Sequence, residues 1–120
     1  MVRRILLVED SELISSGLRI LLESRGYEVT IAASAAAAIE WSGETAPDLV
    51  LLDLTLPDAD GLEVIEGLSQ RGIRPRAVVA LTGHADAATR ERCAVAGCDA
   101  VLVKPVPVQE LLRIVSDKVA

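Results

Sequence analysis

The sequence predicts an α/β fold in which helices cover both faces of a five-stranded parallel sheet. Five short apolar runs alternate with five stretches of helical pattern along the 120 residues, and strict alternation of this kind gives parallel strands joined by right-handed crossovers. Four of the five runs are apolar at every position, as in strands that are covered on both sides. The length suits one domain with a substantial core, so we expect residues 1–120 to form a single domain.

The predicted strands are built from Leu, Ile, Val and Ala, because the chain contains no Phe. The second strand differs from the others: Glu28 and Thr30 alternate with Val29 and Ile31, a pattern typical of a half-exposed edge strand. The five runs cover residues 5–8, 29–32, 49–52, 77–81 and 100–103.

Helices are predicted between these runs by apolar spacing and by the residues that end them. Gly26, Gly72 and Gly97 each follow a helical pattern, where glycine supplies the left-handed turn that terminates a helix. The Ala-rich segment 32–38 is expected to begin the second helix, and Pro107 suits the first turn of the last one. The apolar stripes are Ile14, Leu18, Leu21 and Leu22; Leu62, Ile65 and Leu68; and Leu111, Leu112, Ile114 and Val115.

Five strands in a chain of this length suit the flavodoxin-like order 2-1-3-4-5, a three-layer (βα)5 sandwich. In such sheets ligands bind beyond the carboxyl ends of the strands, where the strand order reverses between the first and third strands. Glu9 and Asp10 follow the first predicted strand, and Asp53 follows the third. The fold therefore predicts that these three acids lie at one crevice.

The overall composition excludes several classes of function. The formal net charge is −6, which argues against nucleic acid as a direct partner because phosphate binding needs clustered Lys and Arg. No apolar run approaches the roughly 18 residues of a membrane span, so we expect a cytoplasmic protein. Cys93 and Cys98 lack a metal-binding spacing, and we expect them to be small packing residues rather than zinc ligands.

Five side chains at strand ends suggest a phosphoryl-transfer site. Glu9, Asp10 and Asp53 would repel one another, and a hard divalent cation such as Mg²⁺ relieves that repulsion. The Asp53 carboxylate can also attack a phosphoryl donor and become an acyl phosphate. Lys104 and the Thr82 hydroxyl could then stabilise the added negative charge. Each residue alone is typical of a solvated loop or a helix cap, and only their common position favours a site.

The same residues resemble the receiver domain of two-component response regulators, and the resemblance covers the whole chain. Residues 5–10 are similar to that family's first strand and acid pair, and residues 53–61 to its phosphoacceptor loop with Pro57 and a closing Asp60-Gly61. Residues 80–83 match its fourth strand with a hydroxyl residue, and residues 103–105 its Lys-Pro pair. Each motif is weak alone, but four in order at the right separations are specific.

The resemblance implies that Asp53 accepts a phosphoryl group from a phosphohistidine on a histidine kinase or histidine phosphotransfer protein. It implies direct Mg²⁺ ligation by Asp10, Asp53 and the backbone carbonyl of Thr55, with Glu9 acting through metal-bound water. It further implies a cis Lys104-Pro105 bond. On phosphorylation, Thr82 would move toward the phosphoryl group and change the face made by the fourth helix, fifth strand and fifth helix. We expect that face to bind a downstream protein or a second copy of the chain.

Three positions distinguish this chain within the resemblance. Val101 stands where the family usually has Tyr or Phe, and a β-branched residue cannot make the rotamer change of an aromatic ring. Thr55 and His84 occupy the two positions that tune the lifetime of the phosphoryl group in the family. We expect the small Thr55 to leave the path of water open, and His84 either to contact the phosphoryl group or to orient a water molecule.

Two alternative functions remain at this stage. Asp53-Leu54-Thr55 loosely resembles the nucleophile motif of haloacid dehalogenase-like phosphatases, but Thr55 is a poor proton donor and the chain has no room for a substrate-capping domain. A receiver that binds partners without being phosphorylated is the other alternative, against which the complete set of acids, Thr82 and Lys104 argues. We therefore expect a phosphoacceptor with self-phosphorylation and autodephosphorylation chemistry only, rather than an enzyme.

Overall fold

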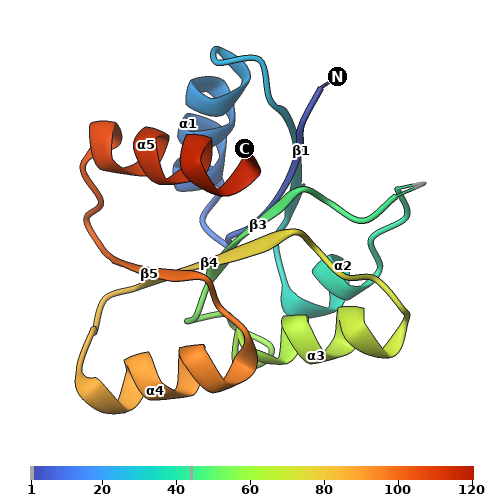
Figure 1. Cartoon of the computed structure of the whole chain (residues 1–120), viewed down its shortest axis with the longest axis vertical. Helices are drawn as coiled ribbons and strands as arrows, with labels where there is room; N and C mark the ends of the chain where they lie inside the picture. Colours follow the sequence, from blue (N-terminus) through green and yellow to red (C-terminus); the bar gives the residue numbers. More distant parts are fainter. Residues whose placement is uncertain (1, 44) are drawn as a thin grey trace.

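A computed structural model describes residues 2–43 and 45–120 and has three layers, with the sheet between two groups of helices (Figure 1). All strand pairs are parallel, and the order β2-β1-β3-β4-β5 confirms the predicted topology. The strands are β1 (Arg4–Val8), β2 (Glu28–Ala32), β3 (Leu49–Asp53), β4 (Ala77–Thr82) and β5 (Ala100–Val103).

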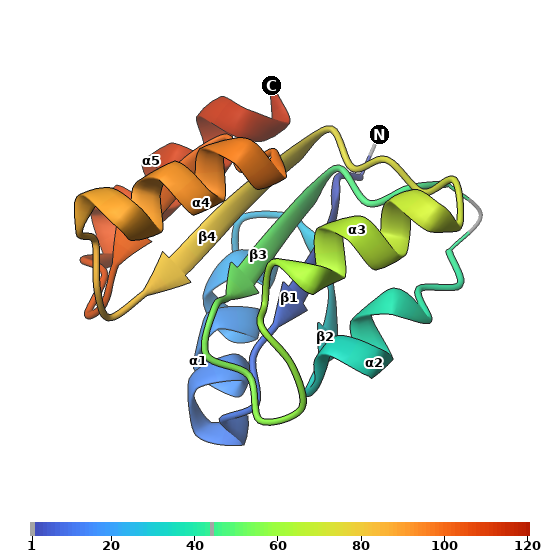
Figure 2. The same cartoon turned by 90° about the horizontal axis from the view of Figure 1, so that it is seen from below.

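Five helices connect these strands. Helices α1 and α5 cover one face of the sheet, whereas α2, α3 and α4 cover the other (Figures 1 and 2). Their bounds are α1 (Glu12–Glu23), α2 (Ala35–Ile39), α3 (Glu63–Gln70), α4 (Ala87–Ala96) and α5 (Val108–Val119). Figure 2 shows the strand arrowheads pointing toward the same end of the sheet, so the loops after the strands gather there.

The helix ends follow the capping rules that the sequence predicts. Gly26, Gly72 and Gly97 have φ of 89°, 76° and 103°, and no other described residue has a positive φ. This left-handed conformation is the one that glycine adopts without a steric penalty. At the opposite ends, the side chains of Ser11, Ser34 and Asp86 accept backbone N–H groups of α1, α2 and α4.

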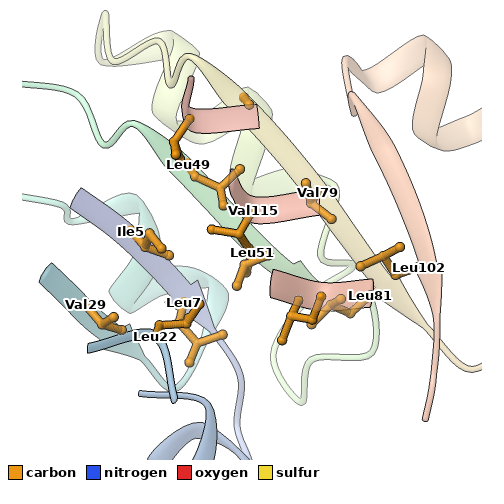
Figure 3. Close-up of a cluster of buried hydrophobic side chains, with 13 residues drawn as sticks. Ile5, Leu7, Leu22, Val29, Leu49, Leu51, Val79, Leu81, Leu102 and Val115 are labelled. Atoms are coloured by element: carbon orange, nitrogen blue, oxygen red, sulfur yellow. The ribbon is translucent and has the colours of Figure 1, made fainter. Parts of the chain in front are cut away.

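Alternate residues of the central strands contribute to two separate cores, because successive side chains in a strand point to opposite faces. Leu7, Leu51 and Val79 are neighbours across the sheet and belong to the core beneath α1 and α5 (Figure 3). Leu6 and Val50 belong to the core beneath α2 and α3. The burial of β1 after Arg4, of β3 before Asp53 and of β4 before Thr82 explains why these stretches are apolar at every position, and β2, which lies at an edge, alternates as predicted.

Ala32 pairs with Val8 as the last residue of β2, as predicted, and α2 begins after the Ser34 cap, within the Ala-rich segment. Two other local expectations differ from the structure by a few residues. Helix α3 buries Val64 and Leu68 rather than the predicted stripe containing Leu62 and Ile65, both of which are half-buried. Pro107 precedes the first residue of α5 instead of lying within its first turn.

The two cysteines lie at and just beyond the end of α4. Cys93 is buried and Cys98 is half-buried, and both are free thiols. Burial, with a smaller contribution from nearby Cys93, raises the pKa of Cys98 to about 12, so its thiol stays protonated at neutral pH. This agrees with the predicted packing role. No helix within the described residues is long and apolar enough to cross a membrane.

The core beneath α1 and α5 provides a direct test of the packing. We expect Leu51→Ala to lower the free energy of unfolding by about 2–5 kcal/mol, because Leu51 is fully buried and its removal leaves a cavity. The same substitution at Leu13, whose side chain is 86% exposed, should change it by no more than about 0.5 kcal/mol. Urea denaturation of both variants measures the difference, and equal effects would contradict the assignment of Leu51 to the core.

Candidate phosphoacceptor site

The register of the sheet places the acids side by side. Val8 of β1 pairs with Leu52 of β3, so the residues that follow them, Glu9 and Asp53, are neighbours at the carboxyl end of the sheet. On the other side of β1, the Glu9 amide continues the pairing with β2 by donating to the Ala32 carbonyl at 3.0 Å. Asp10 is the next residue along the chain, and one carboxylate oxygen from each of Glu9, Asp10 and Asp53 lies within 4.8 Å of the others. The structure thus brings together all three acids predicted from the sequence.

Lys104 reaches this cluster from the end of β5. Its Nζ lies 3.2 Å from Oδ1 of Asp53 and 3.5 Å from Oε1 of Glu9. The Lys104-Pro105 peptide bond is cis, as the resemblance implied. Glu9 and Asp53 are only 2% and 3% exposed, so this ammonium group compensates two carboxylates that have little access to water.

The surroundings of Glu9 disfavour the charged form of its carboxyl group. Burial is the main cause that raises its pKa, and the negative charge of Asp53 raises it further. The Ser11 amide, which donates to Oε2 at 3.2 Å, and the Lys104 charge both lower this pKa, but they do not offset the increase. The site therefore holds more negative charge than its own groups neutralise.

The segment after Asp53 folds back as a narrow hairpin. Thr55 donates its backbone N–H to Oδ1 of Asp53 at 2.9 Å, and Thr55 and Asp60 form an antiparallel bridge. The Gly61 amide donates to the Leu54 carbonyl at 3.2 Å. A Cβ on Gly61 would lie 2.4 Å from the Asp53 carbonyl oxygen, so this close approach admits only glycine. Contact with the Asp53 backbone thus requires glycine at position 61.

Thr82 and His84 lie at the end of β4 and are linked to each other. The Thr82 hydroxyl donates to the His84 carbonyl at 3.0 Å and accepts the His84 amide at 3.1 Å. Thr82 is buried, whereas the His84 side chain is exposed. The hydroxyl is therefore engaged with the loop that leads to α4 rather than with the acids.

Two contacts of the hairpin were not anticipated from the sequence. Asp58 accepts the backbone amides of Ala35 and Ala36 at the start of α2, and Asp60 forms an ion pair with Arg92 of α4. Neither partner is close in sequence, so no local pattern could indicate them. The only available signal was the presence of two acids, Asp58 and Asp60, in a loop already expected to be functional.

The cluster has the composition of a site for a hard divalent cation. Mg²⁺ binds carboxylate and carbonyl oxygens, retains several water molecules and typically uses one or two carboxylates. Glu9, Asp10 and Asp53 supply such oxygens within 4.8 Å of one another, and the Lys104 ammonium pairs with two of these acids, Glu9 and Asp53. The residues present therefore fit Mg²⁺.

The fold and site define a flavodoxin-like domain with an acidic cluster at the carboxyl end of its sheet, and comparison with known proteins identifies its family. The family model for the response regulator receiver domain matches residues 5–116, so the chain belongs to this family. It is 35% identical over 114 residues to the polar-differentiation response regulator DivK of Brucella ovis, covering 94% of this chain and 93% of DivK. It is also 37% identical over 108 residues to the transcriptional regulatory protein KdpE of Mycobacterium tuberculosis, covering 90% of this chain but 47% of KdpE.

Solved structures agree with this assignment. A CheY-like response regulator receiver domain protein from Methanospirillum hungatei superposes with a TM-score of 0.84 at 34% identity, over 99% of this chain and 94% of that protein. The receiver domain of the sensor histidine kinase PA1611 from Pseudomonas aeruginosa gives a TM-score of 0.83 at 32% identity, over 99% of this chain and 98% of that domain. That structure contains a magnesium ion in its active-site cleft. The acidic cluster of this chain fits a receiver Mg²⁺ site.

The raised pKa of Glu9 predicts how the metal-free protein depends on pH. A carboxyl group with a raised pKa in the folded state favours folding when protonated, and this contribution is lost as the pH rises above the ordinary glutamate range. Without divalent cations, Glu9→Gln should therefore be more stable than the wild type near neutral pH, and the gain should disappear toward about pH 4. Urea denaturation in the presence of a chelator measures this difference.

The matched control is Glu12→Gln, which removes an exposed glutamate from the first turn of α1. This control should show no pH-dependent gain. A Glu9→Gln variant that is less stable than the wild type at neutral pH would show that the contacts of Glu9 with Ser11 and Lys104 outweigh its burial.

Proposed function

We propose that the chain is a phosphoacceptor receiver domain that takes a phosphoryl group from a phosphohistidine partner onto Asp53 with the help of Mg²⁺. The observation that carries this proposal is the environment of Asp53: a buried carboxylate beside two further acids and the Lys104 ammonium. Membership of the receiver family supports it. Asp10, Asp53 and the Thr55 carbonyl would hold Mg²⁺ directly, and Glu9 would act through metal-bound water.

The proposed reaction transfers one phosphoryl group between two nucleophiles. A carboxylate oxygen of Asp53 attacks phosphorus, the P–N bond to the histidine ring breaks, and the imidazole leaves with the bonding electron pair and takes up a proton. Bound Mg²⁺ supplies charge neutralisation at the phosphoryl oxygens. Lys104, already 3.2 Å from Asp53, is placed to stabilise the negative charge that the product adds.

The contacts of Thr82 suggest how phosphorylation reaches the surface. To donate to a phosphoryl oxygen, the Thr82 hydroxyl must give up its bond to the His84 carbonyl, which releases the loop before α4. Val101 is half-buried and aliphatic, so an aromatic ring takes no part at this position. We propose that the resulting change affects the α4–β5–α5 face, where the apolar side chains of Val95 and Val103 are exposed, and that a downstream protein or a second copy binds there.

A second surface suits the phosphodonor. A largely apolar cavity of about 490 Å³ opens between α1 and α5, directly beside the acceptor site. A protein that brings a phosphohistidine to Asp53 would lie over this cavity, and we propose that apolar side chains of that protein pack into it. The residues that line the cavity are Glu9, Ile14, Leu18, Leu81, Lys104, Pro105, Val106, Val108 and Leu111.

The phosphatase alternative has weaker support. Haloacid dehalogenase-like enzymes need a proton donor two residues after the nucleophile, and Thr55 occupies that position here. The family match is also to receivers. No observation favours steady turnover over a single phosphorylation event.

The decisive experiment is to incubate the protein with phosphoramidate, whose P–N bond resembles that of phosphohistidine, and to measure the intact mass with and without Mg²⁺. We expect one Mg²⁺-dependent, acid-labile phosphoryl group in the wild type and none in Asp53→Asn. The control Asp48→Asn, which removes an aspartate that precedes β3 at the opposite end of the sheet, should be phosphorylated normally. No adduct on folded wild-type protein would indicate a receiver that acts without phosphorylation, and continuous phosphate release would indicate a phosphatase.

His84 provides a separate test of phosphoryl lifetime. We expect His84→Ala to change the half-life of phosphorylated Asp53 at least about twofold, roughly 0.4 kcal/mol in the hydrolysis barrier, because the exposed imidazole flanks the path of an attacking water. The rate of phosphate loss after removal of the donor measures this effect. Glu91→Ala, on the exposed part of α4, serves as the control, and equal half-lives for all three proteins would remove His84 from the proposal.

A further inference from the structure

The tip of the hairpin that follows Asp53 is hydrogen-bonded to another part of the protein, the start of α2. Thr55 and Asp60 pair across its base, so residues 56–59 form the tip. Asp58 lies within this tip, and its two carboxylate oxygens accept the amides of Ala35 and Ala36 at 3.0 and 3.1 Å. These bonds connect the loop after β3 to the beginning of α2, which follows β2.

The position of this connection matters because of the strand order. Strand β1 lies between β2 and β3, so a bond from the β3 loop to α2 passes beside the end of β1, which carries Glu9 and Asp10. Both amides belong to the first turn of a helix, where N–H groups lack partners within the helix and favour a negative charge. Hydrogen bonds from the same amides lower the pKa of Asp58. Its carboxylate therefore stays charged, and keeps its bonds to α2, at pH values below the ordinary pKa of aspartate.

We propose that Asp58 is a positioning residue of the metal site: by clamping the hairpin tip to α2, it holds the backbone of Thr55 in the orientation that lets its carbonyl bind Mg²⁺. This inference rests on the proposed function for the role of Thr55. Only residues 56–59 separate the paired Thr55 and Asp60, so a rotation of this short tip would be transmitted to the backbone of Thr55. Groups that orient a ligand without touching the metal commonly affect metal affinity.

The test compares Asp58→Ala with Ser34→Ala by titration calorimetry with Mg²⁺. Ser34 caps the same helix by accepting the Ala37 amide at 3.1 Å, and none of its side-chain hydrogen bonds reaches the hairpin. We expect Asp58→Ala to raise the Kd for Mg²⁺ about threefold to tenfold, Asp58→Asn to raise it less because one acceptor oxygen remains, and Ser34→Ala to leave it unchanged. At saturating Mg²⁺, the rate of phosphorylation by phosphoramidate should return to the wild-type value.

Amide hydrogen exchange in the metal-free protein provides the second measurement. Loss of the clamp should speed exchange at Gly61 and Leu62, whose amides bond to Leu54 and Asp60, in Asp58→Ala but not in Ser34→Ala. Equal Kd values for Mg²⁺ in the wild type and Asp58→Ala would overturn the proposal. So would equal increases of this Kd in Asp58→Ala and Ser34→Ala. If the wild type bound no Mg²⁺, the proposed function would fail, and unchanged exchange in Asp58→Ala would then reject the clamp independently.

Discussion

The parallel pairing of β1 with β3 is the constraint on which the acceptor site depends. Because Val8 pairs with Leu52, the residues that follow this pair, Glu9 and Asp53, emerge side by side, and both happen to be acids. A shift of one residue in this register would exchange the side chains that β1 contributes to the two cores and would separate Glu9 from Asp53. The packing of both cores around β1 and β3 therefore also keeps these two acids together.

The charge balance of the site follows from that geometry. Two nearly buried carboxylates share a single ammonium group and have a more exposed third acid beside them, and burial makes this arrangement costly for Glu9 in particular. Such a site gains stability from any cation that supplies the missing positive charge. The same excess of negative charge that raises the pKa of Glu9 in the metal-free protein is thus what makes the cluster fit a divalent cation.

The acceptor loop connects this site to the helices on one face of the sheet. Asp58 bonds to the start of α2, Asp60 pairs with Arg92 of α4, and Gly61 leads directly into α3. Thr82 is joined to the loop before α4. The helices α2, α3 and α4 therefore each have a direct contact with a loop of the site, whereas α1 and α5 line the largely apolar cavity beside it.

Sequence patterns were sufficient for the class of fold because the signals involved are local. Full apolar strands, one alternating edge strand and glycines at Gly26, Gly72 and Gly97 each reflect the conformation of a few adjacent residues. The positions of Glu9, Asp10 and Asp53 at strand ends, combined with the strand order expected for this fold, were enough to place them together. Finer boundaries, such as the start of α5 after Pro107 rather than before it, depend on the local path of the backbone, which propensity alone does not decide.

Contacts between distant segments were decided only by the tertiary structure. The partners of Asp58 and of Asp60 lie 23 and 32 residues away along the chain, and no spacing rule relates such positions. The raised pKa of Glu9 likewise depends on burial and on Asp53, neither of which is encoded in the residues beside it. The sequence by itself determined which chemical groups stand at the strand ends, and packing determined how closely they approach, how far water is excluded and which helices hold the loop between them.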